Sequence, residues 1–268
     1  MKTRAITGLF FIVVMLGSML TNAYVFSLFY LLLSVLCLHE FYKMVKQSGQ
    51  QPAMGAGLAA GALIFAAFAA TRYLHAYWPL ALLSLPMVYI FIQQLFKFSE
   101  SPFTAVGYTF LGLLFTTVPF CFFHALAFMQ NGTFNFHFPL AFFIMLWAND
   151  TGAYLVGRWL GRTKLFERHS PKKTWEGFFG GVVISALAGI ILSHYYTELE
   201  WRRWVSVAII IGCFGTLGDL TESMLKRSIN VKDSGNILPG HGGLLDRFDG
   251  LLLAAPVVFT YLYLVFNL

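Results

Sequence analysis

The sequence predicts an all-α integral membrane protein of about nine transmembrane helices, with a cytoplasmic N-terminus and a C-terminus outside. Of the 268 residues, 58% are hydrophobic and only 11% are charged, whereas about a quarter of the residues in soluble domains are charged. Apolar stretches recur along the chain, each near the roughly 20 residues that a helix needs to cross the hydrocarbon core. Because backbone polar groups in lipid must be satisfied within the segment, runs of Leu, Ala, Met and Phe favour helices over barrel strands.

The candidate spans are separated by short polar stretches. They cover residues 5–20, 23–42, 54–71, 76–96, 103–129, 138–160, 177–196, 203–218 and 249–266. The first could also be a signal peptide, but a retained span is favoured because a second span follows almost at once. We expect one polytopic domain over 1–268. Residues 1–135 supply helical spans, and residues 136–268 form a catalytic half with cytoplasmic loops at 158–176 and 219–249.

The basic residues predict the orientation, because Lys and Arg accumulate in short cytoplasmic loops. With the N-terminus inside, all 18 except Arg72, Arg202 and Arg203 fall on the cytoplasmic side. Orientation and attraction to anionic lipid therefore explain the net charge of +6. We expect a multi-pass protein of the cell (inner) membrane, with no nucleic-acid partner and with its chemistry facing the cytoplasm.

Polar residues with helical spacing follow the eighth span. A helix continuing out of that span places Asp219, Glu222, Ser223 and Lys226 on one face, because they are spaced i, i+3, i+4 and i+7. A solvated amphipathic turn is the alternative explanation for this feature alone. The glycine-rich stretch 232–243 can bring backbone N–H groups close to an anion, although most glycine-rich loops merely turn the chain.

The ninth span opens with two aspartates, Asp246 and Asp249, three residues apart. The glycine-rich stretch joins a helix that leaves the membrane to one that re-enters it, so these carboxylates and Asp219 can converge. Three facing carboxylates repel one another unless a cation lies between them. Their oxygens suit Mg²⁺ rather than zinc.

Two further polar features lie upstream. Asp150 interrupts an apolar span, which makes it a functional candidate by default, with a structural ion pair as the alternative. In the stretch 170–177, Ser170 can cap a helix that begins at Pro171. Lys172 and Lys173 would then lie at the positive end of that helix, which indicates a phosphate site, although anchoring by positive charge is equally simple.

Taken together, these motifs closely resemble the signature of the phosphatidate cytidylyltransferases, also called CDP-diacylglycerol synthases. The resemblance rests on Ser223-Met-Leu-Lys226-Arg227, Lys232-Asp233-Ser-Gly235 and the run from Leu238 to Asp249. It extends upstream to Gly218-Asp219, to Asp150-Thr-Gly-Ala-Tyr154 and to the block 170–177. The first half of the chain matches only as a run of spans.

The resemblance implies transfer of CMP from CTP to phosphatidic acid, giving CDP-diacylglycerol and pyrophosphate in phospholipid biosynthesis. It also implies a requirement for Mg²⁺, a second cation (K⁺ or Mg²⁺) and a homodimer. We expect the catalytic residues to be Asp219, Lys226, Asp246 and Asp249, with Asp219, Asp246 and Asp249 as metal ligands. The expected substrate-binding residues are Asp150, Lys172, Lys173, Ser223, Arg227, Lys232, His241, Gly242, Gly243 and Arg247.

His241 is expected to position substrate rather than to act as a base, because a phosphate monoester has a second pKa near 6 and arrives largely ionised. Two other classes of function remain open at this point. A transporter or channel would explain Asp150 in a polar cavity. Another CTP-using membrane enzyme, such as a lipid-alcohol kinase or an isoprenoid cytidylyltransferase, would share the phosphate chemistry. The Asp-Gly-x-x-Ala-Arg opening of the CDP-alcohol phosphotransferases is absent.

Overall fold

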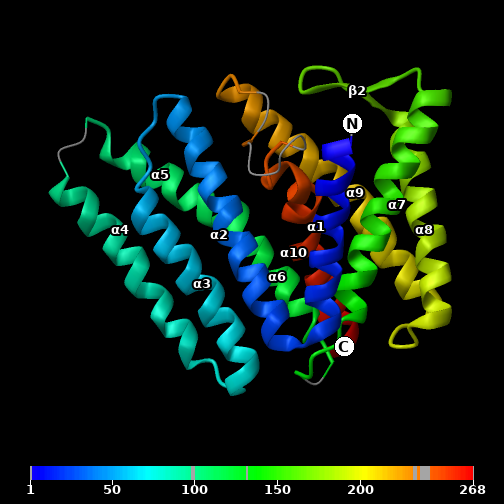
Figure 1. Ribbon diagram of the computed structural model, residues 1–268, viewed down its shortest axis with the longest axis horizontal. Coiled ribbons are helices and arrows are strands. Elements are labelled where there is room, and N and C mark those ends of the chain that lie inside the picture. Colours follow the sequence, from blue (N-terminus) through cyan, green and yellow to red (C-terminus); the bar gives the residue numbers. More distant parts are fainter. Residues whose placement is uncertain (1, 98–99, 131, 232–233, 236–241, 268) are drawn as a thin grey trace. The chain divides into compact units, whose positions relative to one another are not determined.

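The computed structural model describes residues 2–97, 100–130, 132–231, 234–235 and 242–267 (Figure 1). The chain forms two compact units, each described below by itself. The first contains Met1–Phe134 and Ser228–Phe248, and the second contains Asn135–Arg227 and Asp249–Leu268. The division between spans and a catalytic half near residue 135 stays a prediction, because compactness does not test which part carries catalysis.

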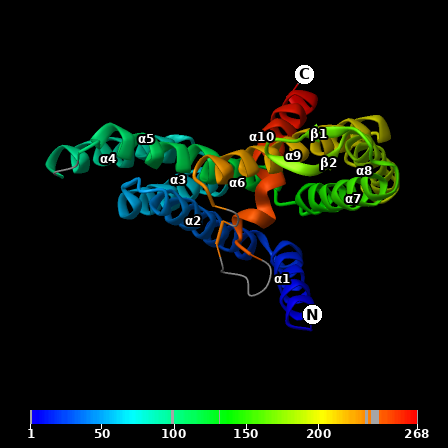
Figure 2. The same ribbon diagram turned by 90° about the horizontal axis from the view of Figure 1, so that it is seen from above.

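The first unit is a layered bundle of helices in which α2, α3, α4 and α5 follow one another as neighbours (Figure 1, Figure 2). Its elements are α1 (Lys2–Thr21), α2 (Ala23–Gln47), α3 (Met54–Leu74), the 3₁₀ helix η1 (Trp78–Leu83), α4 (Ser84–Phe96), α5 (Pro102–Gly112), the π-helical turn η2 (Leu113–Thr117) and α6 (Val118–Leu126). Tyr42 of α2 fills the space left by Gly57 of α3 and Gly112 of α5. Its hydroxyl donates to the carbonyl of Thr109 at 2.7 Å, so the absence of side chains at two glycines allows three helices to pack around one aromatic ring.

The second unit contains three long helices and a hairpin. Its elements are α7 (His137–Leu160), strands β1 (Lys164–Phe166) and β2 (Ser170–Thr174), α8 (Trp175–Tyr195) and α9 (Trp201–Ser228). The last helix, α10 (Leu245–Asn267), begins in the final segment of the first unit and continues into the second. The strands pair antiparallel, with Lys164 opposite Thr174. This hairpin is an addition to the all-α architecture that the sequence predicts.

The predicted transmembrane fold is confirmed. In the described ranges, eight helical segments are long and apolar enough to span a membrane, and α1 supplies a shorter apolar helix, Phe10–Thr21. Each predicted span coincides with one of these segments. The largest difference is that α9 continues to Ser228 rather than ending at residue 218, as the spacing of its polar residues indicates. The orientation of the termini stays a prediction.

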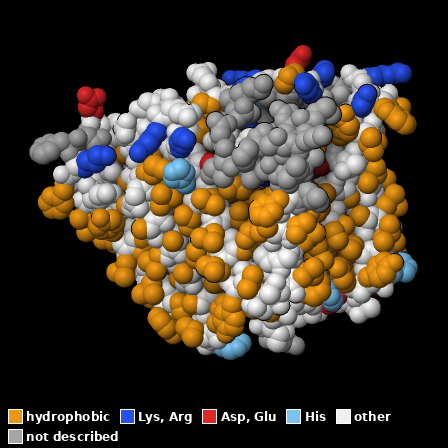
Figure 3. Space-filling view, in the orientation of Figure 1, with side chains coloured by type: hydrophobic (Ala, Val, Ile, Leu, Met, Phe, Trp, Pro, Cys, Tyr) orange, Lys and Arg blue, Asp and Glu red, His pale blue; other side chains and the backbone are white. Residues whose placement is uncertain are grey.

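Apolar side chains are spread widely over the visible surface, and basic side chains gather near one end of the helices in each unit (Figure 3). In the second unit this is the end that carries the β1–β2 hairpin. Large apolar side chains such as Leu95, Phe103 and Trp159 are 79%, 80% and 81% exposed. Exposure of this kind is stable where lipid replaces water.

Candidate active site

A cavity of about 440 Å³ lies in the second unit, between α7, the hairpin, the start of α8 and the middle of α9. It contains several of the residues that the sequence singles out. The lining consists of Asn149, Asp150, Ala153, Tyr154, Gly157, Arg158, Leu165, Lys172, Lys173, Thr174, Gly177, Phe178, Thr216 and Asp219. The lining combines acidic and basic groups with apolar ones, which suits a ligand with a charged head and an apolar body.

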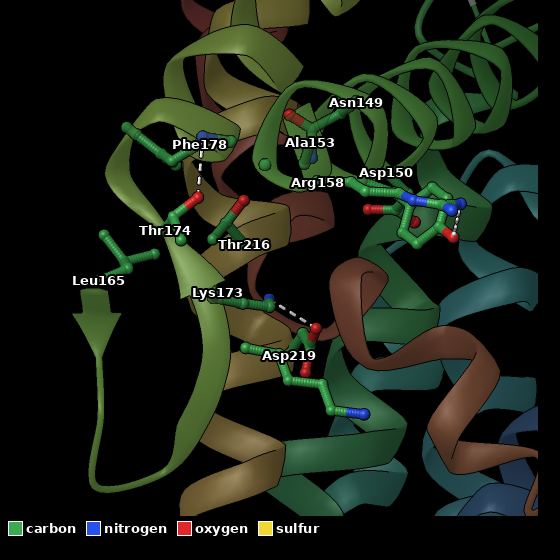
Figure 4. Close-up of a pocket in the computed structure, with 14 residues that line it drawn as sticks. Asn149, Asp150, Ala153, Arg158, Leu165, Lys173, Thr174, Phe178, Thr216 and Asp219 are labelled. Atoms are coloured by element: carbon green, nitrogen blue, oxygen red, sulfur yellow. Dashed lines mark hydrogen bonds and ion pairs between the residues drawn. The ribbon is translucent and has the colours of Figure 1, made fainter. Parts of the chain in front are cut away.

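An ion pair between a strand and a helix lies in this cavity (Figure 4). The Nζ of Lys173, from β2, lies 2.5 Å from Oδ2 of Asp219, from α9. The two side chains are 27% and 37% exposed, so both groups remain accessible to a ligand. The other oxygen of Asp219 accepts a hydrogen bond from Ser223 Oγ at 3.2 Å, which fixes the direction of the carboxylate.

Helices α9 and α10 approach each other closely beside this ion pair. A Cβ atom on Gly218 would overlap the backbone carbonyl of Asp249 and lie 3.3 Å from the Cα of Gly250. The contact therefore requires glycine at 218. It brings Asp249 into the electrostatic reach of Asp219, Asp150 and Lys173. The prediction that α9 and α10 bring Asp219 and Asp249 together is consistent with this geometry.

Glycines also set the position of Asp150. A Cβ on Gly177 of α8 would overlap the carbonyl of Ala153, and a Cβ on Gly181 would overlap the backbone carbonyl and side chain of Asn149. Helices α7 and α8 therefore pack backbone against backbone, as small residues allow in membrane bundles. Asn149 is buried, whereas Asp150 is exposed to the cavity.

The predicted helix start at Ser170 and Pro171 is wrong. Both residues lie in β2, and α8 begins at Trp175 with Thr174 as its cap. The Thr174 hydroxyl accepts the N–H of Gly177 at 3.2 Å, whereas Ser170 pairs across the hairpin with Phe166. Lys172 and Lys173 thus reach the cavity from a strand and not from the positive end of a helix.

A carboxylate that the sequence did not single out, Glu176, fixes the hairpin to α8. It accepts hydrogen bonds from the backbone N–H groups of Arg162 and Thr163 at 3.1 Å. The backbone N–H of Trp175 also donates to the carbonyl of Thr163 at 3.0 Å. An acidic residue in the first turn of a helix was the available signal, because the helix dipole and free N–H groups favour it there.

The four polar residues on this face of α9 form two pairs, and the partners in each pair are four residues apart. Besides the Ser223–Asp219 hydrogen bond, Lys226 Nζ lies 2.6 Å from Oε2 of Glu222. The Glu222 side chain is fully buried. Lys226, in the last turn of α9, therefore compensates the negative charge of a buried carboxylate. Arg227 is exposed at the C-terminal end of α9.

In the first unit, a buried carboxylate of α2 binds described residues within and just after the glycine-rich stretch 232–243. Oε2 of Glu40, which is 1% exposed, accepts the backbone N–H of Leu245 at 2.9 Å and the hydroxyl of Ser234 at 3.4 Å. Gly235 and Gly243 lie against the same carboxylate, so neither position has room for a Cβ. Glu40 is not among the site residues predicted from the sequence, although a lone acid in an apolar span was a usable signal.

The Asp246 carboxylate also binds described residues of the glycine-rich stretch 232–243. Its Oδ2 accepts the backbone N–H groups of Ser234 at 3.1 Å and Gly243 at 3.0 Å. Gly242 adopts φ +81°, a left-handed conformation that glycine accommodates without strain. Asp246 belongs to the first unit, so the convergence of all three aspartates stays a prediction. Arg247 is exposed, and Lys232 and His241 lie outside the described residues.

The described ranges contain no cluster of three or more His, Cys, Asp and Glu side chains that could hold a metal ion by themselves. The acidic groups near the cavity, Asp150, Asp219 and Asp249, nevertheless supply hard oxygen donors next to Lys173. Mg²⁺ is usually held by one or two carboxylates together with substrate phosphates and water. The donor set therefore fits a magnesium ion that binds together with a nucleotide.

Comparison with known proteins decides the family. The profile of the cytidylyltransferase family matches residues 2–265. The chain belongs to this family. Among curated proteins it is 31% identical over 265 residues to phosphatidate cytidylyltransferases of Staphylococcus epidermidis and Staphylococcus aureus, covering 96% of this chain and 97% of each relative. The phosphatidate cytidylyltransferase of Staphylococcus haemolyticus is 39% identical over 165 residues, covering 61% and 59% of the two chains.

The similarity to the cytidylyltransferases is wider than the motifs from Asp150 to Asp249 indicate. The family profile and the two longer matches include the first half of the chain, which the sequence analysis treated only as a run of spans. Glu40 lies in that half. Membership of a cytidylyltransferase family also favours an enzyme over the transporter or channel considered above.

Proposed function

We propose that this cytidylyltransferase transfers CMP from CTP to phosphatidic acid, giving CDP-diacylglycerol and pyrophosphate in phospholipid biosynthesis. The observation that carries the proposal is the Lys173–Asp219 ion pair in a cavity with both charged and apolar walls. Such a cavity suits a lipid phosphate whose acyl chains stay in the bilayer. The names of the full-length relatives support the same reaction.

In the proposed reaction, a phosphate oxygen of phosphatidic acid attacks the α-phosphorus of CTP. The bond from the α-phosphorus to the bridging oxygen breaks, and this oxygen leaves with the electron pair as part of pyrophosphate. The reaction needs no covalent enzyme intermediate, because phosphoryl-type transfer depends mostly on positioning and charge neutralisation. It needs no strong base either, because the attacking phosphate is already largely ionised.

The basic residues named above are assigned to the two substrates. Lys172, Lys173 and Arg158 line the cavity and would bind the phosphate of the lipid. Arg158 donates to the hydroxyl of Tyr154 at 3.2 Å, so its guanidinium is already directed by a neighbour. Neutralisation of the departing pyrophosphate is assigned to Lys226, Arg227, Lys232 and Arg247. Binding of lipid phosphate by Lys173 would weaken its pairing with Asp219 and free that carboxylate.

Asp219 and Asp249 are the best candidates to hold Mg²⁺, with Asp246 as a third candidate. A bound magnesium ion would supply charge neutralisation at the triphosphate. The requirement for Mg²⁺, a second cation (K⁺ or Mg²⁺), a cytoplasmic site and a homodimer are parts of this proposal. Ser223 would orient Asp219, as its hydrogen bond indicates.

The decisive experiment incubates the purified protein with CTP, phosphatidic acid and Mg²⁺ and measures both pyrophosphate and the lipid nucleotide. We expect both products in equal amounts and neither when phosphatidic acid is omitted. A polyprenyl phosphate and a diacylglycerol serve as competing substrates for the related lipid cytidylyltransferase and kinase activities. Absence of product with phosphatidic acid, or faster turnover with either competitor, would contradict the proposal.

A further inference from the structure

A second cavity, of about 490 Å³, lies in the first unit and is lined by residues of α4 and α5. These two helices are neighbours (Figure 1, Figure 2). It shares no residue with the candidate active site. Its lining consists of Phe91, Ile92, Gln94, Leu95 and Lys97 near the end of α4, and Pro102, Phe103 and Val106 at the start of α5. We call it the α4–α5 groove.

One polar side chain in this groove has no partner. Gln94 is only 4% exposed, and neither Nε2 nor Oε1 makes a hydrogen bond to any part of the chain that the structure describes. A buried amide normally has partners, because an unmet donor or acceptor in an apolar environment is costly. The walls around it are apolar, so the unmet groups indicate a polar ligand in the groove.

The other polar features of the groove favour an anion. Helix α5 begins at Pro102, and the side chain of its cap residue Ser101 makes no capping hydrogen bond. The first N–H groups of a helix have no partner within the helix and carry partial positive charge. Lys97, which is exposed at the end of α4, adds a full positive charge to the same groove. A phosphate would satisfy both features.

The exposed apolar side chains of the groove indicate that the rest of the ligand is apolar. Leu95 and Phe103 are 79% and 80% exposed, and Phe91 is 50% exposed. A free phosphate has no apolar part to cover these side chains. An acyl chain does, and bilayer lipid is present at high concentration beside a transmembrane helix. The combination of anion-binding groups and apolar walls thus fits a phospholipid.

We propose that the α4–α5 groove binds one anionic phospholipid, with its headgroup at Gln94, Lys97 and the start of α5 and an acyl chain along Phe91 and Phe103. Gln94 offers both a donor and an acceptor. A headgroup that has a hydroxyl as well as a phosphate satisfies both, which favours phosphatidylglycerol over phosphatidylcholine. The lipid is a resident of the groove and not the substrate of the active site.

The test measures lipid binding to the full-length protein in detergent by native mass spectrometry, with dioleoyl phosphatidylglycerol and dioleoyl phosphatidylcholine as probes. We expect the wild type to retain one phosphatidylglycerol at concentrations at which phosphatidylcholine is lost. Gln94→Leu and Lys97→Gln should each weaken this binding about tenfold, the effect of losing a hydrogen bond or ion pair to a charged headgroup. Lys97→Gln changes an exposed side chain, so it tests the proposal even if Gln94→Leu fails to fold.

Gln93→Leu is the matched control, because Gln93 is the adjacent residue of α4 and does not line the groove. It should bind phosphatidylglycerol as the wild type does. Equal binding of the two lipids, or equal loss in Gln93→Leu, would overturn the proposal. Displacement of the lipid by inorganic phosphate would instead indicate a free-anion site. A dimer that Gln94→Leu dissociates would indicate that a second copy of the chain covers the groove, and either result also overturns the proposal.

Lipid binding in the α4–α5 groove and catalysis at the candidate active site are tested separately. Production of CDP-diacylglycerol is measured on the same samples, and all three variants should retain it in detergent. If the wild type makes no product but binds phosphatidylglycerol selectively, the proposed reaction fails and the lipid site stands.

Discussion

The ammonium group of Lys173 lies 2.5 Å from the carboxylate of Asp219, and this ion pair connects strand β2 to helix α9. Replacement of Lys173 by Gln removes the charge but keeps a side chain of similar length. We expect kcat/KM for phosphatidic acid to fall at least about tenfold, because a charge-assisted contact to the lipid phosphate is lost. Arg168→Gln, which removes an exposed charge from the hairpin turn, should have little effect. Similar losses in both variants would indicate that general surface charge, and not Lys173, binds the lipid.

Asp249 should determine the requirement for magnesium. Chelation of divalent ions is expected to stop turnover, and re-addition of Mg²⁺ should restore it. In Asp249→Asn the Mg²⁺ concentration for half-maximal rate should rise about 10- to 100-fold, because one charged oxygen ligand is lost. The variant Asp246→Asn separates a structural role from a metal-binding role, since the Asp246 carboxylate binds the N–H groups of Ser234 and Gly243. A lower melting temperature with an unchanged Mg²⁺ requirement in Asp246→Asn would remove Asp246 from the metal site.

Glu40 should stabilise the positions of Ser234 and Leu245, the described residues that it binds. Glu40→Ala leaves the N–H of Leu245 and the hydroxyl of Ser234 without their acceptor, which should cost about 1–3 kcal/mol for each buried group. Glu40→Gln retains an acceptor and should lose less. Melting temperatures in detergent and limited proteolysis between residues 228 and 248 measure the effect. Equal stability of Glu40→Ala and the wild type would show that the carboxylate does not hold this segment.

Gly218 should tolerate no side chain. In Gly218→Ala the added Cβ meets the backbone carbonyl of Asp249, and backbone cannot move aside as a flexible side chain can. We expect a loss of about 1–3 kcal/mol of stability and a larger loss of activity, since Asp219 and Asp249 are displaced from each other. Gly107→Ala is the control, because a Cβ on Gly107 meets nothing within 4 Å. That variant should be at least as stable as the wild type, since alanine favours helices.

Glu198 predicts a pH dependence at the loop between α8 and α9. Burial pushes the pKa of Glu198 upward, but hydrogen bonds from Asn135 and His137 outweigh this effect and hold the pKa below its ordinary value. A carboxyl group whose pKa is lowered by folding stabilises the protein above its unfolded pKa, near 4.3. That stabilisation is lost as the pH falls through the folded pKa. Glu198→Gln should therefore lower the melting temperature at pH 7 by more than at pH 4, and a difference that does not change with pH would contradict this.

The hydrophobic pattern was enough to predict the spans, because lipid forces each backbone segment to satisfy its own hydrogen bonds. The spacing of the polar residues also indicated that the helix continues past residue 218, as α9 does. The start of α8 was predicted wrongly because Ser170 and Thr174 are both good cap residues. The choice between them depends on pairing with Lys164–Phe166, and a local pattern does not contain that pairing.

The sequence placed Lys173 and Asp219 in one functional region but did not predict their ion pair. That contact joins residues 46 positions apart in the chain, and it depends on the tertiary packing of the hairpin, where Glu176 accepts backbone hydrogen bonds from Arg162 and Thr163. Glu40 was missed for a related reason. Its partners lie almost 200 positions away in the chain, and only the tertiary fold brings a lone acid in a span to them.

The packing of α7 against α8 also limits how this site can change under selection. Gly177 and Gly181 meet backbone atoms of α7 directly, so any larger residue at either position would separate the helices and move Asn149 and Asp150. If an inhibitor bound against the α7–α8 contact, few substitutions there would both weaken its binding and leave the protein folded. Resistance would have to arise at exposed lining residues such as Tyr154, whose side chain can be exchanged without disturbing the backbone contact between the helices.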